Sequence, residues 1–113
     1  MRRTRMKRKP PRPRPKGHVD EAYKAWVRLQ MCRVAVALNT FAGCMGRIQP
    51  HHAGEHGLSQ LPPDNTCIPL CLGDHDARHN LTGFFRGMSK EQRRAWEDEQ
   101  IRITQNDYPG GAP

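Results

Sequence analysis

The side chains best suited to chemistry gather between residues 51 and 83. His51 and His52 come first, and His75 and His79 follow four residues apart. Imidazole is a common metal ligand, and one whose ordinary pKa lies near neutrality can also take a proton from water. A small domain that buries little apolar surface gains stability from a bound metal. The block therefore predicts a metal site with a base beside it.

The spacing of the histidines predicts how they divide between these two roles. On a helix, His75 and His79 project from one face about one turn apart, so both can reach one cation. A histidine at the end of a facing strand can supply the third ligand, and its neighbour then points to the other face. Hydrolysis of a phosphodiester needs such a cation and such a base. These residues favour a nuclease.

The ordered combination of motifs around these histidines also resembles HNH nucleases. It is similar to the small phage-type branch that includes the Ref recombination-associated nuclease. The resemblance covers residues 32–83. Its parts are His51-His52-Ala53-Gly54, Gly57-Leu58-Ser59-Gln60, Asp64, Ile68-Pro69-Leu70-Cys71, and His75 and His79 before Gly83.

This resemblance implies a small ββα-metal (His-Me finger) domain that cleaves DNA as an endonuclease or nickase. It implies His52 as the general base, although the roles of His51 and His52 could be reversed. Asp64 or Asn65 would be the middle residue that orients the base or the loop. The expected cation is Mg²⁺, with Mn²⁺ or Ni²⁺ as alternatives. Its ligands would be His51, His75 and His79.

Members of this branch also often hold a structural zinc, and here that pattern is altered. Eleven residues separate Cys32 from Cys44, and Asp74 stands three residues after Cys71. Asp can bind zinc, although thiolate and imidazole are more usual in closed sites. The expected zinc ligands are Cys32, Cys44 and Cys71, with Asp74 or Cys67 as the fourth. The alternative is that Cys67 and one other cysteine are ordinary small buried residues and the core stands without zinc.

The first sixteen residues are cationic, whereas the remaining ninety-seven are close to neutral. Four prolines in this stretch exclude a helix and favour an extended arm. Such an arm suits non-specific, salt-sensitive binding to the phosphate backbone of DNA. A solubilising tail, a localisation signal or a docking segment for a recombinase filament are alternatives. The basic residues are Arg2, Arg3, Arg5, Lys7, Arg8, Lys9, Arg12, Arg14 and Lys16.

The elements that must position the histidines are predicted from periodicity and turn residues, and they give an α+β domain. Helices are expected over residues 19–38, 74–81 and 89–103, and short strands over residues 46–50 and 66–70. The run 34–38 could instead begin a buried strand. Ser89 and Gln92 fit a capping box for the last helix. The expected organisation is a basic disordered arm (1–17), an HNH-like domain (18–105) with flanking helices, and a flexible tail (106–113).

The composition of the chain excludes further classes of protein. The longest apolar runs fall short of the ~20 residues that span a bilayer, and the charged, proline-containing start does not resemble a secretory signal. A cytoplasmic protein is expected, in the host cytoplasm if it is phage-encoded, with reduced cysteines and no small-molecule cofactor. The main alternative function is a non-catalytic, zinc-stabilised module that binds nucleic acid or assists recombination. Metal stoichiometry separates the two.

Overall fold

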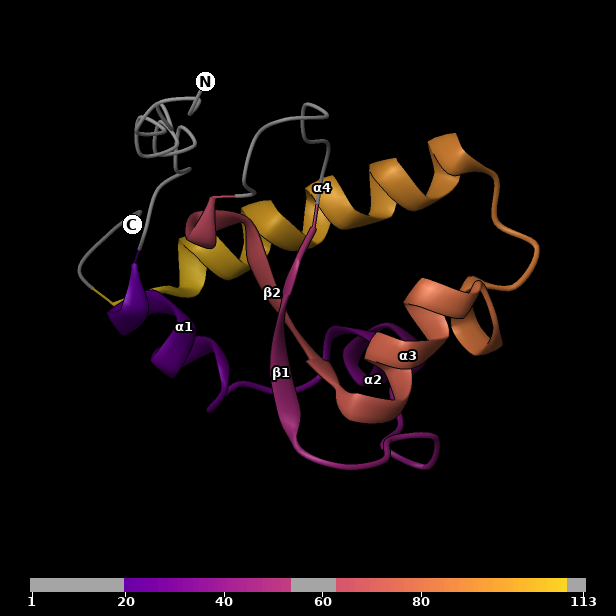
Figure 1. Cartoon of the computed structure of the whole chain (residues 1–113), viewed down its shortest axis with the longest axis horizontal. Helices are drawn as coiled ribbons and strands as arrows, with labels where there is room; N and C mark the ends of the chain where they lie inside the picture. The colour runs from indigo at the N-terminus through magenta and orange to yellow at the C-terminus, as the bar shows by residue number, and fades with distance from the viewer. Residues whose placement is uncertain (1–19, 54–62, 110–113) are drawn as a thin grey trace, which may run out of the picture.

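Helices flank a two-stranded antiparallel sheet, as Figure 1 shows for the computed structural model. The structure describes residues 20–53 and 63–109. Its α+β class is the one that the sequence predicts. The elements within these ranges are α1 (Glu21–Val27), α2 (Arg33–Leu38), β1 (Ile48–His52), the 3-10 helix η1 (Asp64–Thr66), β2 (Cys67–Cys71), α3 (Leu72–Asn80), the 3-10 helix η2 (Gly83–Phe85) and α4 (Lys90–Asp107).

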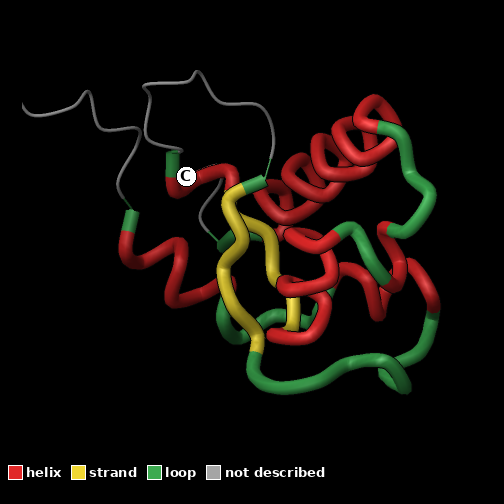
Figure 2. The backbone as a smooth tube through the Cα atoms, turned by 45° about the vertical axis from the view of Figure 1, so that its right-hand side comes forward, coloured by secondary structure: helices red, strands yellow, loops and turns green. Residues whose placement is uncertain are grey.

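The sheet places both histidines of the pair on β1. The strands pair with Ile48 opposite Cys71 and His52 opposite Cys67. Both strands lie later in the chain than predicted, so β1 ends on the histidine pair and not before it. All of β2 is buried, because α1, α2, α3 and α4 pack around it. In Figure 2 the sheet runs through the middle of the molecule, between the helices.

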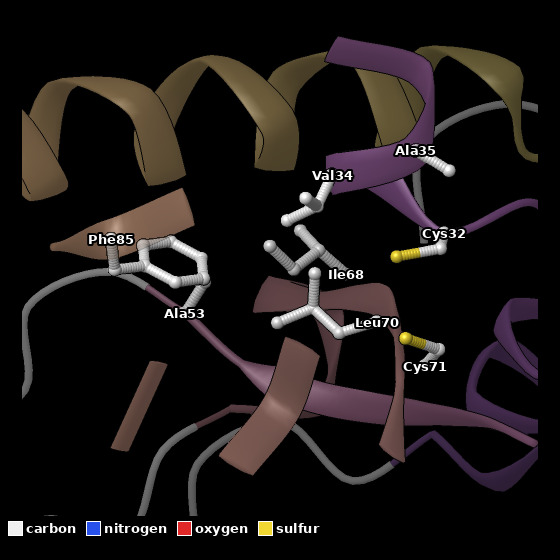
Figure 3. Close-up of a cluster of buried hydrophobic side chains, with 8 residues drawn as sticks. All are labelled: Cys32, Val34, Ala35, Ala53, Ile68, Leu70, Cys71 and Phe85. Carbon is white, nitrogen blue, oxygen red and sulfur yellow. The ribbon is translucent and has the colours of Figure 1, made fainter. Parts of the chain in front are cut away.

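The core consists of two clusters. The larger one joins α2, β2 and η2, and Figure 3 shows Phe85 beside Ala53 at one end and Cys32 and Cys71 at the other. The smaller one contains Tyr23, Val27 and Cys67. Helices α1 and α2 therefore cover different parts of the sheet.

The prediction of one helix over residues 19–38 is wrong, because the chain turns between α1 and α2. Two tight turns end α1, with the N–H groups of Leu29 and Gln30 donating three residues back. Cys32 then adopts an extended conformation as the N-cap of α2 (φ −56°, ψ 128°) and is 1% exposed. Because of this break, the side chains of Val34 and Ala35 point into the larger cluster, which they would not do from a continuous helix. The run 34–38 is helical and not a strand.

The starts of the last two helices are fixed by side chains. The predicted capping box is confirmed, because Ser89 accepts from the N–H of Gln92 and the Gln92 side chain accepts from the N–H of Ser89. Helix α3 begins at Leu72, two residues before the predicted start, with the Cys71 sulfur as its cap. Helix α4 continues to Asp107, four residues past the predicted end, and Tyr108 packs edge-on against Tyr23 with ring centroids 5.0 Å apart.

Candidate metal and hydrolytic site

The two histidines on β1 point in different directions, as the alternation of a strand requires. His51 is 6% exposed and faces α3 and α4. The His52 side chain is 33% exposed and faces Asp64. Neighbouring residues thus enter two separate groups of side chains.

His51, His75 and His79 form the first group. Each offers a ligand nitrogen, and these atoms lie within 4.8 Å of one another. The Nε2 atoms of His75 and His79 are 3.1 Å apart. Two nitrogens bound at about 2.1 Å to one cation lie roughly 3.0 to 3.4 Å apart, so this pair is already close to the spacing of ligands. The group could hold a metal ion, and it contains the three histidines that the sequence predicts as ligands.

Hydrogen bonds select which nitrogen each of these rings can offer. His75 places Nδ1 2.7 Å from the side-chain oxygen of Gln49, so Nδ1 carries the proton and Nε2 is left with its lone pair. His51 places Nε2 2.8 Å from Oε2 of Glu97, which leaves Nδ1 as the possible ligand. Outer partners of this kind orient metal-binding imidazoles. Gln49 and Glu97 both lie outside the set of residues that the sequence predicts.

Glu97 is the buried acid of the site and comes from α4. It is 3% exposed and bridges His51 and Arg78, whose Nε and Nη2 lie 3.0 and 2.8 Å from Oε1. Burial alone would raise the pKa of Glu97, but the hydrogen bonds from His51 and Arg78 outweigh it and lower that pKa. Glu97 therefore remains a carboxylate that holds His51 in place. Arg78, from α3, completes this bridge.

The electrostatics around His75 favour a neutral imidazole. Burial lowers the pKa of His75, and the neighbouring His51 and His79 lower it further. A neutral ring keeps the lone pair that a metal ion needs. His75 therefore remains ready to bind a cation under conditions where an isolated histidine would begin to take up a proton.

His52 and Asp64 form the second group. Nε2 of His52 lies 3.0 Å from Oδ1 of Asp64, and the N–H of Asp20 donates to Oδ2 at 2.8 Å. Burial alone would raise the pKa of Asp64, but the bonds from His52 and Asp20 and the charge of Lys24 lower it. Asp64 thus accepts the Nε2 proton of His52 and leaves Nδ1 as the nitrogen that can act as a base.

Asn65, the other candidate for the middle position, is placed differently. Its backbone oxygen accepts a hydrogen bond of 2.7 Å from the side chain of Gln105 on α4. The carboxylate beside His52 belongs to Asp64. Of the two candidates that the sequence leaves open, the structure brings Asp64 to the histidine.

One pocket connects the two groups. It has a volume of about 410 Å³, is open to solvent and is lined by both His52 and His75. A ligand in this pocket can therefore contact the candidate base and a candidate metal ligand at once.

Cys32, Cys44, Cys71 and Asp74 form a third group, whose ligand atoms lie within 4.8 Å of one another. Oδ2 of Asp74 is 3.1 Å from the sulfurs of Cys32 and Cys71 and 3.9 Å from that of Cys44. Sulfur and oxygen ligands of a tetrahedral zinc lie roughly 3.6 Å apart, so the donors fit such an ion. Figure 3 shows two of these cysteines side by side at the edge of the core. The group could hold a metal ion.

Burial keeps the thiols of Cys32 and Cys44 protonated in the absence of a metal ion. It raises the pKa of Cys32 to about 12 and also raises the pKa of Cys44. Metal binding must therefore release protons, which makes it weaker in acid.

Cys67, the alternative fourth ligand, lies away from this group. It is fully buried, packs with Tyr23 and Val27, and lies near His52 and Asp64. Burial raises the pKa of Cys67 to about 12, so its thiol behaves as a small apolar group. The structure thus brings Asp74, and not Cys67, to the other three cysteines.

Glu97, like Gln49, is a residue of the candidate site that the sequence does not predict. The only signal for it is a row of polar residues spaced three and four apart on α4, namely Glu97, Gln100 and Thr104. Such a row normally marks a solvent-facing side, but here all three are buried. The nine basic residues between positions 2 and 16 lie outside the described residues.

Every helix in the described ranges is too short or too polar to cross a membrane. Comparisons of the chain with protein-family models, with curated proteins and with solved structures gave no match.

Proposed function

We propose that this chain is a metal-dependent DNA endonuclease or nickase of the ββα-metal (His-Me finger) type. The observation that carries the proposal is the shared pocket, which His52 and His75 both line. His52 has a carboxylate partner that can orient it as a general base. His75 belongs to a group of three convergent imidazoles. The succession of β1, β2 and α3 that supplies these residues also fits this type of domain.

A divalent cation bound by His51, His75 and His79 would neutralise the negative charge that develops on the phosphate and on the departing 3′-oxygen. Nδ1 of His52 takes a proton from water, and the resulting hydroxide attacks phosphorus while the bond to the 3′-oxygen breaks. Asp64 holds the His52 ring and stabilises its positive charge after the proton transfer. Glu97 does not touch the substrate in this scheme, and it positions His51.

We also propose that Cys32, Cys44, Cys71 and Asp74 hold a structural zinc. Three thiolates and one carboxylate fill a tetrahedral site, which leaves no position for substrate. A zinc bound there would link the start of α2, the turn before β1 and the start of α3. These elements are short and gain from such a link. The site would add stability to a domain with a small core.

The nuclease proposal is tested with the full chain on supercoiled plasmid in Mg²⁺ or Mn²⁺, with and without chelator. We expect metal-dependent nicking, and we expect His52→Ala to lower kcat by about 10² to 10⁴ while DNA binding is retained. His18→Ala, in the N-terminal segment, controls for the loss of one imidazole. Uncut plasmid with the wild-type chain in both metals would exclude the proposal. A chain that binds one zinc and DNA but does not cleave would instead fit the non-catalytic module.

A further inference from the structure

The pocket beside the candidate site carries a concentration of positive charge. It lies along α1 and the start of β1, and the cations that line it are Lys24, Arg28 and Arg47. Among the described residues that line it, none is acidic. This is unexpected in a chain whose residues after position 16 are close to neutral in total. The charges are therefore localised where His52 and His75 open to solvent.

These three cations come from two separate segments that the fold brings together. Lys24 lies within α1 and Arg28 caps its last turn, whereas Arg47 immediately precedes β1. Helix α1 packs against both strands of the sheet, with α3 farther along the molecule (Figure 1). The arrangement brings cations from two segments of the chain to one pocket.

The two arginines are available to a ligand, whereas the lysine is engaged. Nζ of Lys24 lies 3.0 Å from Glu21 and 3.6 Å from Asp64. Within residues 20–53 and 63–109, neither Arg28 nor Arg47 forms an ion pair, and both are exposed. Lys24 therefore stabilises the carboxylate that orients His52, and the two guanidinium groups remain to bind an anion.

Guanidinium groups suit oxyanions, and phosphate is one of them. Their planar donors match the oxygens of a phosphate and often bind two of them at once. Phosphate contacts position a nucleic acid without reading its sequence. Two such contacts beside a base and a metal ligand would hold one strand at a fixed offset from the reacting atoms.

We infer that Arg28 and Arg47 form a phosphate-binding subsite that seats the phosphodiester backbone of a nucleic acid over His52 and His75. This inference rests on the proposed function, because a phosphodiester held over His52 and His75 is in a position to be cleaved only if these residues form a nuclease site. The role of this subsite differs from the role expected of the N-terminal arm. The subsite belongs to the folded domain and sets the register of the bound strand. The arm is expected to raise the local concentration of the nucleic acid.

The experiment measures binding of a fluorescent duplex by the full chain as a function of salt, without added Mg²⁺ or Mn²⁺ so that the duplex stays intact, and without chelator so that the proposed zinc stays bound. For each of Arg28→Gln and Arg47→Gln, we expect the slope of log affinity against log salt to fall by about 0.9, and for the double variant by about 1.8. Arg86→Gln is the matched control, since Arg86 is also exposed but lies at the end of η2 and does not line the pocket. Thermal melting confirms that the variants are folded.

The outcomes separate this inference from the nuclease proposal. If the wild type binds but does not cleave, and the two variants still lose slope, the subsite stands and the nuclease proposal fails. If the wild type cleaves and the variants keep its slope, or if Arg86→Gln loses as much, the subsite is excluded. Duplex DNA and duplex RNA are measured in parallel. Equal losses identify the shared backbone as the ligand, and a loss on one alone identifies that nucleic acid.

Discussion

His51 and His52 are joined by one peptide bond, yet they have different partners and are assigned different roles. His51 meets Glu97 and the histidines of α3, whereas His52 meets Asp64. The strand causes this division, because successive side chains leave it on opposite faces. The two side chains therefore cannot exchange places without a change in the backbone. A substitution at one of them should leave the other in place.

Glu97→Gln tests the outer partner of His51. The amide keeps the shape of the side chain but loses the charge that holds His51 and Arg78. We expect the affinity for the cation proposed to bind His51, His75 and His79 to fall by about 10- to 100-fold, which is usual when such a partner is lost. Metal titration of the cleavage rate measures this effect. Glu99→Gln is the control, because Glu99 lies two residues along α4, is exposed and pairs with Arg102. Equal metal dependence in both variants would contradict a positioning role.

The sequence could reveal the histidines but not Glu97. His75 and His79 are recognisable because a helix places residues four apart on one face, a purely local rule. Glu97 reaches His51 only through the packing of α4 against β2, which no local pattern reports. The choice between Asp64 and Asn65 depends in the same way on how η1 sits beside β1.

At the scale of elements, the turn before β1 is held against the first turn of α3. The N–H groups of Leu72 and Gly73 donate to the backbone oxygens of Arg47 and Met45, each at 2.9 Å. Gly46 sits inside this turn with φ +76°. The turn brings Cys44 to Cys71 and Asp74, so its geometry decides whether the third group can form.

Gly46→Ala should destabilise this turn. An added Cβ would lie 2.7 Å from Cβ of Leu72, at a backbone conformation that L side chains rarely adopt. We expect a loss of about 2 kcal/mol in the free energy of unfolding, together with weaker zinc retention. Gly43→Ala is the control, because an added Cβ there meets nothing within 4 Å and should change stability by less than about 0.5 kcal/mol. Denaturant unfolding of the two variants measures both changes in the free energy of unfolding.

The cysteine group is tested by comparing two equally buried cysteines. Cys32 is 1% exposed and Cys67 is fully buried, yet only Cys32 belongs to the group with Asp74. We expect Cys32→Ala to lose about one zinc per chain and Cys67→Ala to retain it. Asp74→Cys should hold zinc more tightly, since thiolate replaces carboxylate. Zinc content by mass spectrometry and competition with a chelator provide the measurements. Equal zinc in the two alanine variants would exclude the site.

The elements themselves were partly predictable. Residues 89–92 carry a capping box, and its local hydrogen bonds make the start of α4 readable from the chain. The break between α1 and α2 was not readable, because the apolar spacing runs on through it. The turn there depends on Cys32 reaching a core formed by distant residues.

At the scale of the whole molecule, stability should fall in acid in two stages. The pKa of His75 is lowered by burial, so the unfolded chain takes up this proton first, and stability declines as the pH falls below about 6.5. The pKa values of Asp64 and Glu97 are also lowered, so their contribution is present above about pH 4 and is lost as the pH falls through their folded values.

Melting temperatures across this range measure both stages. Glu97→Gln should flatten the stage near pH 4 and leave the stage near pH 6.5. Asp98→Asn serves as the control, because Asp98 is the neighbouring acid on α4 and is exposed. A wild-type chain that gained stability on acidification would contradict the assignment of these charges.

Helix α3 has a further consequence for the molecule as a whole. Its first turn contributes Asp74 to the cysteine group, and the very next residue, His75, belongs to the histidine group. Since the helix is rigid over so short a distance, an ion bound at its start would fix the rotation and height at which His75 and His79 are presented. Occupancy of one group would then reduce the conformational entropy that the other group loses when it binds its own ion. By thermodynamic reciprocity, each ion would raise the affinity of the other group by the same factor. The two ions would therefore bind cooperatively, in an order set by their relative affinities.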